Sequence, residues 1–192
     1  MLRYATDLAY YYVETRSKRY VAAVDDMVVG TVVGTVGEMF DVDVGAAHSA
    51  SLPVLAFERV TKKNRPRLER GDVVYARVTT ASKHVAPELQ CVSKRNKSDG
   101  FGPLAGGLVL SCSLPHAAEL LRKDCYVLNR LGREFPFEIA VGHNGRFWLN
   151  AVSPARTLLA AQALINAEFL ADAQVDTMIT VLVQQAKAAG SL

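Results

Sequence analysis

A stretch rich in lysine and arginine runs directly into a predicted β-strand at residues 57–78. Its last part, residues 73–78, is β-branched and aromatic, and a Gly-Asp pair opens it. Residues 59–70 hold one glutamate and six cations: Arg59, Lys62, Lys63, Arg65, Arg67 and Arg70. A basic loop that leads into a strand suits a small β-barrel that holds a phosphate backbone, although a solvated connector would explain the charge equally well.

The composition describes a globular chain whose charge surplus is local. Of its 192 residues half are hydrophobic, and the net charge is only +3, so the chain can bury a core and its basic surplus is concentrated in one patch. The three cysteines form no C-x-x-C pair and the four histidines lack metal-ligand spacing, which predicts no disulfide framework, metal site or cofactor. Without an apolar run of membrane-spanning length or a signal-peptide pattern, we expect a soluble intracellular protein with no membrane partner.

Short alternating or β-branched runs predict five strands, over residues 27–36, 40–44, 49–57, 72–80 and 88–93. The basic stretch then forms a long connector between the third and fourth strands, which is the pattern of an OB-type barrel. Such barrels bind single strands on one face and with the flanking loops. The candidate RNA contacts are therefore Lys62, Lys63, Arg65, Arg67, Tyr75, Arg77, Lys83, His84 and Phe40. Burial in the barrel core explains Phe40 and Tyr75 equally well.

A second unit follows residues 94–102, which are polar, contain glycine and are interpreted as a linker. A short strand is expected at 108–112, a helix after Ser113 and further helices after Ser153 and Asp172. Residues 135–141 alternate apolar and polar up to Gly-His-Asn-Gly, and Asn-Gly between such runs predicts a hairpin. The fold class is thus mixed β and α+β, with a five-stranded OB-type barrel followed by a KH-like α+β domain.

Several segments together resemble one family. They are residues 17–21, 26–30, 62–66, 71–76 and 142–148. Two of them, Lys-Lys-Asn-Arg-Pro and the pattern Gly-x-Asn-Gly-(Arg/Lys)-x-Trp, are specific in this order and spacing. Across roughly residues 16–170 the chain resembles the exosome cap subunits of the ribosomal RNA-processing protein 40 family, also called exosome component 3.

The resemblance implies an S1 domain of OB type over residues 20–95 and a KH-like domain over 96–192. Residues 1–19 are shorter than the family's N-terminal domain, and we expect an arm or a remnant of it there. The family implies a non-catalytic subunit that staples a ring of RNase PH-like proteins, contacts the other cap subunits and guides single-stranded RNA into the channel. It also implies localisation in the nucleus, including the nucleolus, and in the cytoplasm.

The Gly-x-x-Gly tetrad at residues 142–145 has a predicted structural role. KH domains hold phosphates with such a tetrad between two helices, whereas this one lies between two strand-like runs. The resemblance agrees, since it implies a variant motif that packs at the boundary with the S1 domain. The residues assigned to this hairpin at the domain interface are Gly142, Asn144, Gly145 and Trp148.

Catalysis finds no support in the sequence. Asp25 and Asp26 are adjacent and Asp41 and Asp43 share a strand face, but no His or Glu is placed to join them in a metal site. The cysteines lack a histidine at readable spacing. We therefore expect no enzyme activity and assign no catalytic residue. The alternative function is a free-standing RNA-binding protein with the same two domains that acts outside the exosome.

Overall fold

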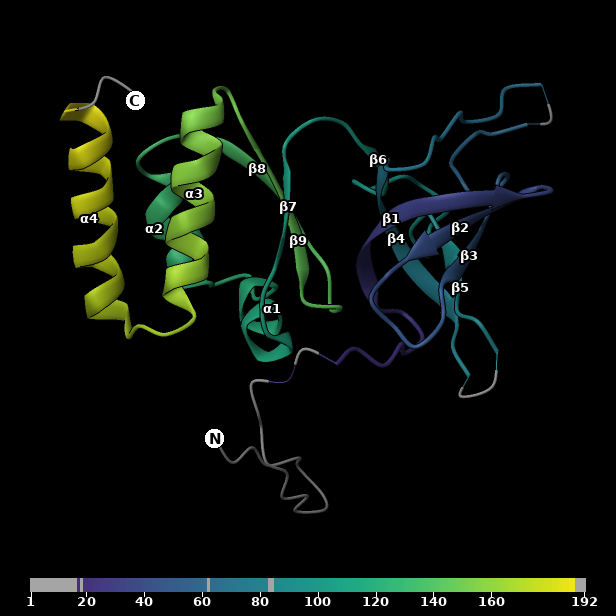
Figure 1. Cartoon of the computed structure of the whole chain (residues 1–192), viewed down its shortest axis with the longest axis horizontal. Coiled ribbons are helices and arrows are strands. Elements are labelled where there is room, and N and C mark those ends of the chain that lie inside the picture. Colours follow the sequence, from purple (N-terminus) through teal and green to yellow (C-terminus); the bar gives the residue numbers. More distant parts are fainter. Residues whose placement is uncertain (1–16, 18, 62, 83–84, 189–192) are drawn as a thin grey trace, which may run out of the picture.

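The structure is a computed structural model that describes residues 17, 19–61, 63–82 and 85–188. Most of the predicted N-terminal arm, residues 1–16 and 18, lies outside the described residues. The chain forms two units side by side, with a β-barrel at one end, helix α4 at the other and a three-stranded sheet between them (Figure 1).

The first unit is a closed barrel. Its strands are β1 Met27–Val36, β2 Met39–Asp43, β3 Ala50–Pro53, β4 Val73–Thr80 and β5 Glu88–Gln90. They pair in the order β1-β2-β3-β5-β4, and β4 pairs again with β1, which closes the sheet. Only the β3–β5 pair is parallel among these. The predicted five-stranded OB-type barrel is confirmed.

Strand β1 closes the barrel because it bends sharply enough to pair with two neighbours. Its first half pairs with β4 and its second half with β2, and the register shifts between Val32 and Gly34. At Gly30 an added Cβ would lie 3.2 Å from the side chain of Val44 and still closer to that of Val42. Glycine therefore allows β1 and β2 to approach closely inside the barrel.

The barrel sheet extends beyond its five main strands. A short strand that the sequence did not predict, β6 Gly102–Leu104, pairs antiparallel with β4 from Val73 to Tyr75. Residues 102–104 therefore belong to the barrel sheet, although the sequence placed them at and after the linker. We propose that the domain boundary lies between β6 and β7 rather than after residue 95.

The second unit is a three-stranded antiparallel sheet with helices on one side. Its elements are β7 Leu108–Ser111, α1 Leu114–Leu120, α2 Tyr126–Gly132, β8 Phe137–Val141, β9 Arg146–Ala151, α3 Pro154–Ala167 and α4 Asp172–Ala188. The sheet order is β7-β9-β8. Ser113 and Ser153 cap α1 and α3 through their hydroxyls, as Ser-x-Pro and Ser-Pro signals suggest. The KH-like α+β domain is confirmed, while the short helix α2 was not anticipated.

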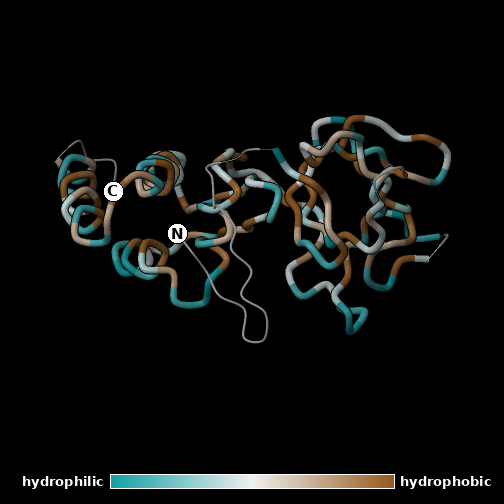
Figure 2. The backbone as a smooth tube through the Cα atoms, turned by 90° about the horizontal axis from the view of Figure 1, so that it is seen from below, coloured by the Kyte–Doolittle hydropathy of each residue, from teal (hydrophilic) through white to brown (hydrophobic). Residues whose placement is uncertain are grey.

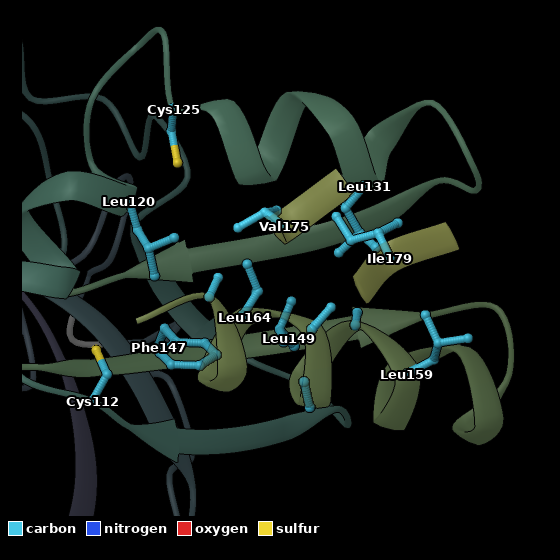
Figure 3. Packing of buried hydrophobic residues seen from close by; sticks show 14 of the residues in the cluster. Cys112, Leu120, Cys125, Leu131, Phe147, Leu149, Leu159, Leu164, Val175 and Ile179 are labelled. Carbon is cyan, nitrogen blue, oxygen red and sulfur yellow. The ribbon is translucent and has the colours of Figure 1, made fainter. Parts of the chain in front are cut away.

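The two faces of this sheet have different partners. Phe147 and Leu149 on β9 belong to a core with the helices, in which Leu164 and Ile179 are fully buried (Figure 3). Trp148, between them, points to the other face and packs with Val29 of the barrel. The apolar stretches of this sheet therefore lie between the barrel on one side and the helices on the other (Figure 2).

Replacement of Trp148 by alanine should destabilise the protein strongly. Trp148 is 5% exposed, and its indole N–H donates to the carbonyl of Gly106 at 2.8 Å. Truncation of a buried tryptophan costs about 3–5 kcal/mol. Urea denaturation should show this loss, whereas Val152→Ala, at a residue that is 82% exposed, should change the free energy of unfolding by less than about 0.5 kcal/mol. Equal midpoints for the two variants would contradict the assignment.

Candidate nucleic-acid interface

Residues 58–71, here called the basic connector, are fixed to the barrel at both ends. At the start, the amide of Cys91 donates to the carbonyl of Ala56 at 2.8 Å. At the end, Gly71 donates to the carbonyl of Val32, and the amide of Val32 donates to Asp72, both at 2.8 Å. These hydrogen bonds at both ends restrict the positions of the cations between them far more than a free tail would.

The described cations of the basic connector face solvent. Arg59, Lys63, Arg67 and Arg70 are exposed, and the side chain of Arg59 is 91% exposed. Lys62 lies outside the described residues. Exposed cations on a fixed loop can contact phosphates of a flexible strand at a small entropic cost.

Arg65 has an additional partner that the sequence did not reveal. Its guanidinium lies 2.8 Å from the carboxylate of Glu38, in the turn between β1 and β2, and its side chain is 42% exposed. The ion pair joins the middle of the basic connector to the end of the barrel. Arg65 can therefore position the connector as well as contact a phosphate.

Two predicted aromatic contacts have structural positions instead. Phe40 is only 4% exposed in the barrel core, so it cannot stack on a base. Tyr75 stacks on Phe101 with ring centroids 5.0 Å apart, and its hydroxyl donates to the carbonyl of Val141 at 3.0 Å. Burial raises the pKa of Tyr75 to about 12. The base contact predicted for Phe40 is therefore wrong, whereas that of Tyr75 stays a prediction, with its ring against Phe101 and its hydroxyl bonded to the second domain.

Arg77 is also held by the protein. Its guanidinium lies 2.9 Å from the carboxylate of Asp25, and its Nε donates to the carbonyl of Val92 at 3.4 Å. Asp25 has a left-handed backbone, with φ of 72°, and also pairs with Lys94 at 2.8 Å. Arg77 therefore joins β4 to the segments before β1 and after β5, and its predicted RNA contact stays a prediction.

Lys83 and His84 lie outside the described residues, so their predicted RNA contacts stay predictions. Ser82 and Val85 line a hollow of about 380 Å³ together with His48, which follows β2. Glu38, which contacts the basic connector, precedes β2. The hollow and the Glu38–Arg65 ion pair therefore lie at opposite ends of β2.

Asn144 inserts its side chain between the two domains. Its amide nitrogen donates to the carbonyls of Val29 and Val44, at 2.8 and 2.9 Å, and its amide oxygen accepts from the backbone N–H of Val29 at 3.3 Å. A Cβ at position 142 would lie 2.7 Å from the same N–H, so glycine there allows the close approach. The tetrad at residues 142–145 thus contacts the barrel through buried hydrogen bonds.

A second polar contact supports this junction. The guanidinium of Arg146 donates to the carbonyl of Asp43 at 2.8 Å and lies 2.9 Å from its carboxylate. Burial raises the pKa of Asp43, but the Gly45 N–H and Arg146 outweigh it and hold the pKa below its usual value. His143 adds a backbone bond to the carbonyl of Met27 at 2.7 Å.

The turn between α1 and α2 is where a KH domain carries its phosphate-binding tetrad. In this chain residues 121–125 form that turn, and their sequence, Leu-Arg-Lys-Asp-Cys, contains no glycine. Arg122 and Lys123 are exposed there. Within the described residues, no group of three His, Cys, Asp or Glu could hold a metal ion, and no helix is both long and apolar enough to cross a membrane.

The closed barrel and the β-α-α-β-β-α unit together define a two-domain protein of S1 and KH type. Residues 20–102 match the family model described as the S1 domain of exosome complex component RRP40, and residues 107–155 match a KH domain model. The Drosophila melanogaster exosome complex component RRP40 is 44% identical over 86% of this chain and 72% of its own. The Schizosaccharomyces pombe exosome complex component rrp40 is 42% identical over 83% of this chain and 68% of its own.

This chain belongs to the family of exosome complex component RRP40. A crystal structure of a protein assigned as an exosome complex RNA-binding protein agrees in fold, with a TM-score of 0.73. The match covers 89% of this chain and 99% of the crystallised chain, at 20% sequence identity.

Replacement of Asn144 by alanine should weaken the domain junction. The change removes three hydrogen bonds and leaves buried backbone groups of Val29 and Val44 without this partner. Each unsatisfied group costs about 1–3 kcal/mol. Urea denaturation should show a loss in this range or above, while Asn150→Ala on β9 should cost less. A stability like that of the wild type would contradict the role of Asn144.

Proposed function

We propose that this chain is a non-catalytic RNA-binding cap subunit of the RNA exosome. The observation that carries the proposal is the basic connector, because its ends are pinned to the barrel and its described cations are exposed. The family supports the same function. Its partners would be single-stranded RNA, the RNase PH-like ring subunits and the other cap subunits, and its compartments the nucleus, including the nucleolus, and the cytoplasm.

The contacts proposed for RNA are Lys62, Lys63, Arg65 and Arg67. Their side chains are cationic, so we expect them to contact phosphates rather than base edges. Binding would then be indifferent to base sequence, and its affinity would fall steeply with salt. This suits a subunit that guides many different single strands toward a channel.

Replacement of Lys62, Lys63 and Arg65 by alanine should reduce the salt dependence of RNA binding. For single strands the slope of log affinity against log salt is about −0.7 per phosphate neutralised, so the variant should lose roughly 2 units. The measurement is fluorescence anisotropy with a single-stranded oligonucleotide over a salt series. The control replaces three cations at the helices α2, α3 and α4 of the second domain, Arg133, Arg156 and Lys187, by alanine. Equal effects in both variants would mean that only net charge matters.

Four of the candidate groups for catalysis, Asp25, Asp43, Cys91 and Cys125, are engaged or inert. The carboxylates of Asp25 and Asp43 pair with arginines at 2.9 Å, which leaves them poor ligands for a metal ion. Burial raises the pKa of the Cys91 thiol to about 12 and that of Cys125 above its usual value. These thiols are therefore protonated and not nucleophilic near neutral pH.

The purified chain should not cleave single-stranded RNA. Incubation with Mg²⁺ or Mn²⁺ should leave a labelled oligonucleotide intact on a denaturing gel. Cleavage that disappears in the Asp41→Asn, Asp43→Asn double variant would refute the non-catalytic role.

Purification of the chain with its native partners separates the exosome subunit from a free-standing RNA-binding protein, since only the former elutes with ring proteins.

A further inference from the structure

The segment after β5 is an ordered turn and not a flexible linker. Residues 93–98, here called the cationic turn, close on themselves: Ser93 donates to the carbonyl of Lys97 at 2.7 Å, and Asn96 donates to that of Ser93 at 3.0 Å. The hydroxyl of Ser93 accepts from the amide of Arg95 at 3.3 Å. Asn96 has φ of 55°, which asparagine tolerates better than most residues.

The cationic turn presents three cations and contains no acid, since its sequence is Ser-Lys-Arg-Asn-Lys-Ser. All of residues 94–98 are exposed, and the side chain of Lys94 is 71% exposed. Lys94 is paired with Asp25. Arg95 and Lys97 form no ion pair with any described residue. The charge of Arg95 is therefore available to an anionic ligand, whereas that of Lys97 also acts on the carboxylate of Glu58 and helps to lower its pKa.

The cationic turn is joined to the start of the basic connector. The amide of Ser98 donates to the carboxylate of Glu58 at 2.6 Å, and Arg59 lies 3.5 Å from the same carboxylate. The hydrogen bond from Ser98 holds the pKa of Glu58 below its usual value. Arg59 and Asn96 both line a hollow of about 260 Å³, together with Glu58. The start of the basic connector and the cationic turn therefore border the same hollow.

We propose that the cationic turn is a second phosphate contact for the single-stranded RNA bound at the basic connector. Arg95 and Lys97 would each neutralise a phosphate, and Arg59 would contact the backbone between the two sites. An ordered turn loses little conformational entropy when it binds, which favours a contact that adds to affinity. This inference rests on the proposed RNA-binding function and extends its surface beyond the connector.

The test compares the Arg95→Ala, Lys97→Ala variant of the full chain with the wild type on a single-stranded oligouridylate, by anisotropy over a salt series. The loss of two phosphate contacts should flatten the slope by about 1.4 units. The affinity advantage of the wild type should then shrink about sevenfold between about 50 and about 200 mM salt. The control is Arg133→Ala, Lys187→Ala, which removes the same charge from exposed positions at α2 and α4 of the second domain and should leave the slope nearly unchanged.

The outcomes separate this inference from the function on which it rests. If the connector variant flattens the slope while the turn variant behaves like the wild type and melts at the same temperature, the second contact is refuted and the proposed function stands. If the turn variant loses binding to polyglutamate while its RNA binding is unchanged, the cationic turn would instead contact an acidic protein surface. That result also refutes the second RNA contact. If the wild-type chain has no affinity for RNA, both proposals fall.

Discussion

The structure depends on the insertion of the Asn144 side chain into the edge of the barrel. Its amide satisfies backbone groups of β1 and of the residue after β2, so the contact sets the position of the second domain against two barrel segments at once. Buried amides that bond backbone groups are directional, because an unpaired donor or acceptor there is costly. The domains are thereby held in one relative orientation.

This orientation explains why the RNA contacts that we propose lie elsewhere on the barrel. The outer face of the β7-β9-β8 sheet packs on Val29 and Tyr75, so that side of β1 and β4 is covered by the second domain. The connector and the cationic turn remain exposed on loops. In the proposed function the second domain thus serves as a rigid support, and the electrostatic contacts to RNA are concentrated on the barrel's loops.

The carboxylates near these loops have a common role. Glu38 pairs with Arg65, Glu58 accepts from Ser98, and Asp25 joins Arg77 to Lys94. Each carboxylate fixes a cationic loop to the barrel or to its neighbour. A modest net charge is therefore compatible with a strong local field, because the acids are used to hold the loops while most of the connector's cations stay exposed.

The sequence by itself determined the strands, the barrel and the hairpin, because periodicity and turn residues are local signals. It could not show that Phe40 faces the core or that Tyr75 meets a second domain, since alternation separates two faces without telling what covers each. The positions of Arg65 and Arg77, the strand β6 and the ordered turn at 93–98 depend on partners distant in sequence. Only the tertiary structure decided these, because long-range hydrogen bonds and ion pairs leave no periodic trace in the chain.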